Sequence, residues 1–198
     1  MKHISIFILC ISPYLILPNP QANDWKLKKT SDGIEVFTRS SELSDLDEFK
    51  GIGNINAPLE QIIKVFQNAD QMSYWSPNCE ESRLMERQGN VQIHYTISGA
   101  PFPIQDRDAF TQFKYIPQDN GMKIEISAIP QYGPENEDYV RIQYATGFWM
   151  LEKISENKTK VTYQLQADPG GSIPGWLANT GSVDTPLNTI KSLREYLK

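Results

Sequence analysis

Cys79 and His94 are the residues of this 198-residue chain that could form a nucleophile and its base. A thiol becomes a nucleophile when a neighbouring imidazole accepts its proton, so a Cys79–His94 dyad is one chemistry that the sequence permits. Glu80 and Glu81 follow Cys79 directly, and their negative charges raise the pKa of a thiol. The sequence therefore argues against a cysteine nucleophile.

His94 is the only histidine beyond residue 3. It alternates with Tyr95 in a strand-like run and shares a face with Gln92, Thr96 and Ser98. Because these neighbours are polar, we expect His94 on the solvent side of its strand rather than as a buried base. No catalytic residue is predicted.

The segment Asp106-Arg107-Asp108 places two carboxylates around one guanidinium. Two aspartates at this spacing can hold a metal ion, but the intervening arginine and the lack of a histidine nearby favour a charge network that closes a loop onto the sheet. We therefore predict no metal site. If its side chain points inward, Arg107 could instead meet a ligand carboxylate or hydroxyl.

The composition is that of one globular domain with an acidic balance. Apolar residues make up 39% and charged residues 22%, and the formal net charge is −5. Clustered lysines and arginines, which neutralise phosphates, are missing from the sequence, so nucleic acid is not an expected partner.

The first 22 residues have the three regions of a secretory signal peptide. Lys2 precedes the apolar run 4–17, which is shorter than a membrane-spanning helix, and the polar segment 18–22 follows. We therefore predict a signal peptide over 1–22, one domain over 23–198, and a periplasmic or secreted protein. Cys79 would then be the single cysteine, which excludes an intrachain disulfide.

The rest of the chain alternates strand and helix signals. Strand-like runs cover 34–39, 49–55, 81–88, 91–98, 107–116, 122–130, 139–154 and 159–167. Pro58 opens a helix with an apolar face that includes Leu59, Ile62 and Phe66, and a short helix is expected over 70–75. The segment 167–177 ends the last strand at Pro169 and starts a helix near Ser172.

The C-terminal helix has to cover the sheet. Its apolar stripe comprises Val183, Leu187, Ile190, Leu193 and Leu197. The expected architecture is α+β: a curved antiparallel sheet wrapped around this long helix. A sheet too wide for one helix to fill leaves an internal apolar cavity. The positions that we expect to line it are Tyr95, Arg107, Phe113, Ile126, Tyr144, Thr146 and Trp176.

Four segments of the chain resemble the START (StAR-related lipid-transfer) domain family, which has the helix-grip fold. They are Tyr74-Trp75-Ser76-Pro77 with the run up to Glu86, Pro101 to Asp108, Gly147 to Glu152, and Asp168 to Trp176. Their order and spacing span nearly the whole chain after the signal peptide. The resemblance implies a closed apolar cavity for one lipid or sterol-like molecule, a lid that includes the C-terminal helix, and no cofactor.

These observations predict a monomer that binds one lipid or other hydrophobic small molecule for transport or transfer outside the cytoplasm, with transient membrane contact. Two alternatives stay open. One is a cyclase-like or aromatase-like enzyme, for which an inward ionisable group is needed and Tyr95, His94, Asp106 or Arg107 are the candidates. The other is a ligand-sensing module whose surface meets a partner protein.

Overall fold

The computed structural model describes residues 24–41, 46–171, 173 and 175–198, apart from the side chains of 175–179. The predicted signal peptide, residues 1–22, lies outside this part. In the described residues no helix is both long and apolar enough to span a membrane.

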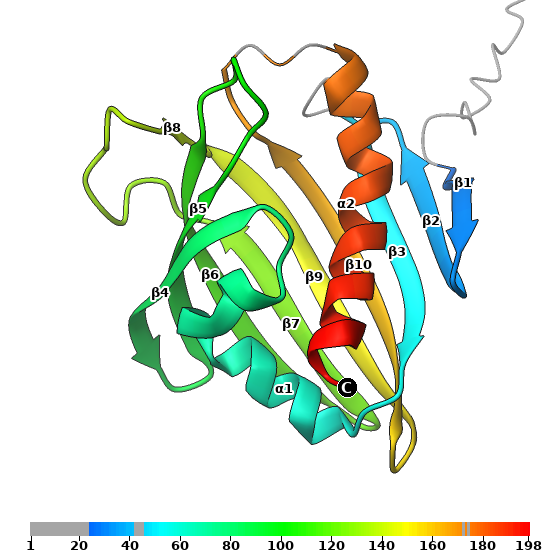
Figure 1. Ribbon diagram of the computed structural model, residues 1–198. Helices are drawn as coiled ribbons and strands as arrows, with labels where there is room; N and C mark the ends of the chain where they lie inside the picture. The colour runs from blue at the N-terminus through cyan, green and yellow to red at the C-terminus, as the bar shows by residue number, and fades with distance from the viewer. Residues whose placement is uncertain (1–23, 42–45, 172, 174) are drawn as a thin grey trace, which may run out of the picture.

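Within the described residues, ten strands form one sheet (Figure 1). The strands are β1 (Lys26–Ser31), β2 (Ile34–Arg39), β3 (Glu48–Ile55), β4 (Cys79–Gln88), β5 (Val91–Ser98), β6 (Arg107–Gln118), β7 (Gly121–Ala128), β8 (Val140–Arg141), β9 (Tyr144–Ser155) and β10 (Lys158–Asp168). Their order across the sheet is β1-β2-β3-β10-β9-β7-β6-β5-β4, and neighbours on this path are antiparallel. The short β8 pairs with β6 in parallel.

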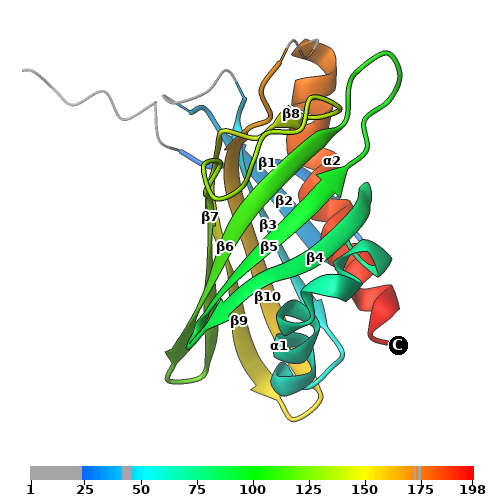
Figure 2. The same ribbon diagram turned by 90° about the vertical axis from the view of Figure 1, so that its left-hand side faces the viewer.

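Three helical elements lie on the concave side of the curved sheet (Figure 2). They are α1 (Leu59–Gln67), the 3₁₀ helix η1 (Ala69–Tyr74) and the long C-terminal α2 (Gly175–Tyr196). The helix α2 packs against β2, β3 and β10, whereas η1 packs against β4 at the other end of the sheet. The predicted fold class, a curved antiparallel sheet around a long C-terminal helix, is confirmed.

The predicted apolar stripe of α2 anchors the helix to the sheet. Leu187, Ile190 and Leu193 are buried in the main core. A Cβ atom added to Gly51 would lie 2.9 Å from Cβ of Pro186, so the absence of a side chain on β3 permits this close approach. Gly51 therefore serves helix packing, and the open space for a ligand lies elsewhere.

The edge strand β1 has no counterpart in the sequence prediction. Its residues KLKKTS are mostly exposed and show no alternation of apolar and polar side chains. Pairing with β2 in register defines this strand. Its lysines are the kind of residue that keeps an exposed edge from pairing with another chain.

The predicted facing of β5 is wrong. Its polar residues point to the concave side, and Tyr95 and Ile97 point to the convex side, where they form a second small core with Phe110. Ile129 and Tyr139, from the segment between β7 and β8, cover this cluster. Because apolar residues are covered on the convex side as well, alternation alone could not tell the two faces apart.

The predicted facing of β9 is also wrong, for a different reason. The expected single strand 139–154 is interrupted between Arg141 and Tyr144, so β8 and β9 are separate strands. The interruption changes which residues point inward. Ala145 and Trp149 face the concave side, whereas Tyr144 and Thr146 lie on the opposite face, and Thr146 is exposed.

Candidate ligand cavity

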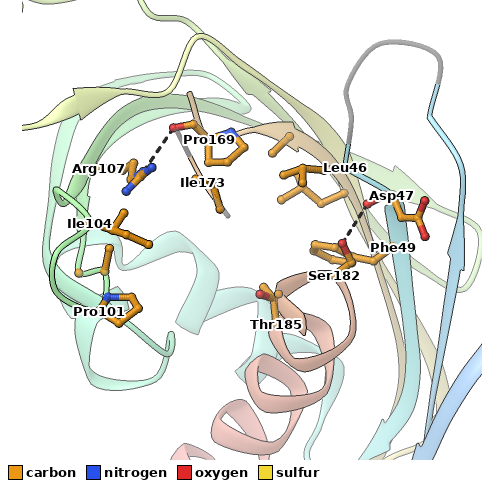
Figure 3. A pocket seen from close by; sticks show the side chains of 15 residues that line it. Leu46, Asp47, Phe49, Pro101, Ile104, Arg107, Pro169, Ile173, Ser182 and Thr185 are labelled. Carbon is orange, nitrogen blue, oxygen red and sulfur yellow. Dashed lines mark hydrogen bonds between the residues drawn. The ribbon is translucent and has the colours of Figure 1, made fainter. Parts of the chain in front are cut away.

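A hollow of about 310 Å³ opens between the loop 99–106, the start of β3 and the first half of α2 (Figure 3). We call it the outer chamber. Its wall includes Phe49, Pro101, Ile104, Leu165 and Ile173, so it is largely apolar. The polar groups at its rim belong to Arg107, Asp47, Ser182 and Thr185.

A second hollow, of about 200 Å³, lies deeper between the sheet and η1, and we call it the inner chamber. It shares Leu165 and Ala167 with the outer chamber, so the two adjoin along β10. Its aromatic and apolar lining consists of Phe66, Met72, Trp75, Phe113, Ile126, Ile142, Trp149 and Tyr163. The rings of Trp149 and Tyr163 stack with their centroids 4.2 Å apart.

Three of the predicted cavity residues line these chambers. Phe113 and Ile126 lie on neighbouring strands, directly opposite each other in the β6–β7 register, and both line the inner chamber. Arg107 lines the outer chamber. The alternation of β6 and β7 predicted these positions correctly because only their concave side is covered by a large core.

Three other predicted residues do not line either chamber. Tyr95 packs on the convex side, with its ring 4.9 Å from Phe110, and its hydroxyl donates a hydrogen bond to Asp108 at 3.2 Å. Tyr144 and Thr146 lie on the convex face of β9, as described above. The seventh residue, Trp176, belongs to the start of α2, but its side chain lies outside the described residues.

The guanidinium of Arg107 is occupied by backbone oxygens. It donates to Gln105 O through Nη1 and to Gly170 O through Nη2 at 3.1 Å. It also donates to Pro169 O through Nε at 3.4 Å (Figure 3). Burial lowers the pKa of this group because it removes water from the charge. The backbone oxygens replace that water as hydrogen-bond acceptors and so stabilise the buried guanidinium. Arg107 thus ties the β10–α2 connection to the start of β6.

The predicted charge network is present only in part, because the two aspartates do not pair with Arg107: Asp106 accepts a hydrogen bond from Ala100 N at 2.7 Å. Asp108 forms a two-pronged ion pair with Arg141, with distances of 2.7 Å and 2.8 Å, and both side chains are buried. Arg141 also donates to backbone oxygens of Pro130 and Pro134 in the segment that covers the convex side. No group of three potential metal ligands occurs among the residues that the structure describes.

His94 is buried, contrary to the expected position on the solvent side. Its ring is 0% exposed and stacks on Phe113 with centroids 4.3 Å apart. Burial, together with the charge of Arg87, lowers the pKa of His94 to about 4, so the imidazole is neutral at physiological pH. The run of polar neighbours on β5 misled the prediction, since Gln92 on the same face is also buried.

Cys79 lacks the properties of a nucleophile. Burial raises the pKa of its thiol to about 11, and the charge of Glu80 adds to this effect. The Sγ atom donates to the backbone oxygen of Glu81 at 3.4 Å. The predicted direction of the pKa shift is confirmed, although burial contributes more than the glutamate charges.

Trp75 and Trp149 line the inner chamber, a position that the sequence leaves open beside a plain core role. Large aromatic residues near a sheet and a helix are usually plain core, and both are indeed buried. Their position in the inner-chamber wall follows from the end of η1 and from the strand break before β9. The sequence predicts the short helix over 70–75 but offers no signal for the strand break.

Comparison with known proteins agrees with this architecture. The START domain family model matches residues 17–198. A crystal structure of a STAR-related lipid transfer protein from Xanthomonas axonopodis is 38% identical, covers 88% of this chain and 99% of its own, and superposes with a TM-score of 0.82. An uncharacterised protein of Pseudomonas aeruginosa is 33% identical over 94% of this chain and 93% of its own. Human phosphatidylcholine transfer protein is 24% identical over 88% and 86%. The chain belongs to the START domain family.

Proposed function

We propose that this protein binds one lipid or similarly hydrophobic molecule in the two adjoining chambers and transfers it between membranes outside the cytoplasm. The observation that carries the proposal is the apolar outer chamber beneath the first half of α2, in a chain of the START domain family. Moving an apolar ligand from water into such a space gains roughly 25 cal/mol for each Å² removed from water. Relatives named as lipid transfer proteins support the same class of ligand.

The two halves of α2 are held differently, which suggests how a ligand enters. In the second half, Arg194 donates to the backbone oxygens of Asn54 and Asp32 at 2.7 Å each, and Leu193 is fully buried. In the first half, Ser182 Oγ donates to Asp47 O at 3.3 Å, and the exposed ion pair of Asp184 with Lys29, at 3.1 Å, contributes at most about 1 kcal/mol. The first half of α2 is therefore the part that opens, with Pro186 between the two halves as the bending point.

The loop 99–106 is the proposed point of membrane contact. Phe102 at its tip is 98% exposed, while Pro101 and Ile104 beside it line the outer chamber. An exposed aromatic residue next to an apolar opening can enter the interfacial region of a bilayer and place the opening at the lipid. The acidic net charge of the chain makes this contact hydrophobic rather than electrostatic.

The direct test is native mass spectrometry of the protein purified from its own host, followed by extraction and identification of any bound molecule. One bound lipid or isoprenoid for each monomer is the expected result, and it also tests the predicted monomeric state. A protein that carries no bound molecule and takes up no lipid from a panel of vesicles would contradict the proposal. Conversion of an added polyketide in place of simple binding would support the enzyme alternative.

Cell fractionation tests the proposed location. The expected result is a periplasmic or extracellular protein whose mass corresponds to loss of residues 1–22.

Replacement of Phe102 by Ser tests the membrane contact, with slower transfer between vesicles and unchanged affinity for the ligand as the expected outcome. Replacing the exposed Ile154, on the opposite end of the sheet from this loop, provides a control.

A further inference from the structure

This inference rests on the proposed function and concerns two buried nitrogen atoms. Trp75 Nε1 and His94 Nδ1 have no hydrogen-bond partner within the described residues. The side chains are 4% and 0% exposed. A buried donor that has lost water and gained no partner destabilises the folded state, so such groups are rare and require an explanation.

The indole of Trp75 belongs to the inner-chamber wall. It follows η1 directly and packs edge-on against Phe66, with the ring centroids 5.2 Å apart. An indole nitrogen donates one hydrogen bond and cannot accept one. Trp75 therefore requires an acceptor atom, which the described residues around it do not supply.

His94 Nδ1 is also a donor, because its neighbours fix which nitrogen carries the proton. We assign the Gln92 amide so that its oxygen faces the Arg87 guanidinium, the orientation in which both ends of the amide have suitable partners; the oxygen then accepts from Arg87 Nη2 at 2.7 Å and from Nε at 2.9 Å. The amide nitrogen then donates to His94 Nε2 at 2.9 Å and to Tyr115 Oη at 3.2 Å, and Tyr115 donates onward to Phe66 O at 2.8 Å. Since Nε2 accepts, the proton of the neutral imidazole is on Nδ1.

The imidazole of His94 is set among residues of the inner chamber. Phe113 stacks on it, Thr111 lies opposite it in the β5–β6 register, and Thr96 follows it on the same face of β5. All three of these neighbours line the inner chamber, and His94 lies behind them. The ring nitrogens of an imidazole point in divergent directions, so Nδ1 is turned away from the Gln92 contact that occupies Nε2.

We propose that the inner chamber receives the oxygen-bearing part of a neutral lipid, and that Trp75 Nε1 and His94 Nδ1 donate hydrogen bonds to acceptor oxygens there. The lining favours an uncharged acceptor, such as an ester, ketone or ether, because no lysine or arginine lines this chamber among the described residues. A carboxylate or phosphate at this depth would be a buried charge without a partner of opposite sign.

A matched pair of competitors tests the proposal. Methyl palmitate and n-octadecane have chains of similar length and differ in the ester oxygens, and each is used to displace a fluorescent NBD-labelled phosphatidylcholine. The ester should bind about five- to tenfold tighter, as expected for one or two hydrogen bonds to neutral donors. Equal affinities would overturn this inference and leave the proposed function intact, whereas failure of the protein to bind any of the three would overturn both.

Two variants test whether Trp75 is a source of the preference for the ester over the hydrocarbon. Trp75→Phe removes the N–H and should reduce the preference for the ester, with His94 Nδ1 as the remaining donor. Trp149→Phe removes the same atoms from another part of the same wall and should retain it. Equal behaviour of the two variants would overturn the assignment to Trp75.

Nuclear magnetic resonance of the unsubstituted protein gives a test that does not depend on the folding of a variant. Addition of methyl palmitate should move the indole proton of Trp75 and the Nδ1 proton of His94 downfield, as hydrogen bonds form. Octadecane should leave both unshifted in that direction. The same shift with both ligands would show that the donors bind only water or protein atoms, and would overturn the proposal.

Discussion

At the mouth of the cavity, the guanidinium of Arg107 donates to three backbone oxygens, whereas Trp75 Nε1 and His94 Nδ1 in the inner region have no partner within the described residues. The charged donor is the one that the sequence made conspicuous. It is satisfied by the protein itself, because a buried charge without hydrogen bonds costs more than a buried neutral group. Two neutral donors left unpaired in the ligand-free protein destabilise the folded state less than an unpaired guanidinium would.

Arg107 and the two inner donors therefore have different roles within one cavity. Arg107 shapes the opening by holding the segment between β10 and α2, and its removal should affect every ligand alike. The inner donors select by chemistry, since an acceptor oxygen satisfies them and a hydrocarbon does not. Four experiments can sharpen or contradict this division, and they follow from the largest expected effect to the smallest.

Acidification should destabilise the protein through His94. The pKa of His94 is lowered from 6.5 to about 4 by burial, helped by Arg87 and opposed by Asp70, so the unfolded chain binds the extra proton first. The contribution of His94 to the free energy of unfolding is complete above pH 6.5 and falls by about 3 kcal/mol as the pH drops to 4. Urea unfolding at a series of pH values measures it.

The variant His94→Asn serves as the reference for that experiment, because carboxylates also titrate at low pH. The unfolding free energies of the two proteins should converge as the pH falls from 6.5 to 4. Parallel curves would show that His94 does not titrate in this window.

Replacement of Arg107 by Met should lower the free energy of unfolding by about 2–3 kcal/mol, because three backbone oxygens lose a charged donor. Affinities for polar-headed and hydrocarbon ligands should fall by the same factor, measured by displacement of a fluorescent lipid. Arg107→Lys keeps the charge but cannot reach three oxygens, and an intermediate loss of stability is expected. A selective loss for polar-headed ligands would instead place Arg107 in contact with the ligand.

Two adjacent residues on β9 test the facing of this strand. Ala145→Phe fills part of the inner chamber and should weaken binding of a bulky lipid about tenfold, which corresponds to about 1.4 kcal/mol. Thr146→Phe places the same ring on the exposed convex face and should leave the affinity unchanged. Circular dichroism and thermal unfolding check that both variants are folded. The reverse pattern of affinities would restore the facing that the sequence suggested.

The smallest expected effect concerns the first half of α2. Lys29→Ala removes the exposed ion pair with Asp184 and should speed lipid transfer between vesicles about two- to threefold, in line with a pair worth less than about 1 kcal/mol. Lys160→Ala removes a similarly exposed pair with Glu152 on the sheet and should leave the rate unchanged. Equal rates for all three proteins would show that this ion pair does not limit opening.

Local sequence patterns predicted most of the elements. The strands β2, β3, β6, β7 and β10, the helix α1 and the apolar stripe of α2 follow from periodicity, because each buries a face against the same core. The strands β4 and β5 were also predicted, but the apolar residues of β5 pack in the small convex core. Phe113 and Ile126 were placed in the cavity on the same ground. The strand β1 was not predicted because an exposed edge strand needs no apolar face.

The inner chamber itself could not be predicted in the same way. The convex side of β5 is covered by a distant segment, so Tyr95 became core while polar Gln92 and His94 turned inward. A break of two residues before β9 exchanged the facing of Ala145 and Thr146. A period of two fixes which residues share a face, but it does not state which face is covered.

By itself, the sequence determined a curved antiparallel sheet with a C-terminal covering helix, and the family. The tertiary structure decided which donors are already occupied. Backbone oxygens of Pro169 and Gly170 meet Arg107 only when the start of β6 and the end of β10 come together, and none of the described residues does the same for Trp75. Hydrogen-bond partners of this kind are distant along the chain, so the fold alone sets them.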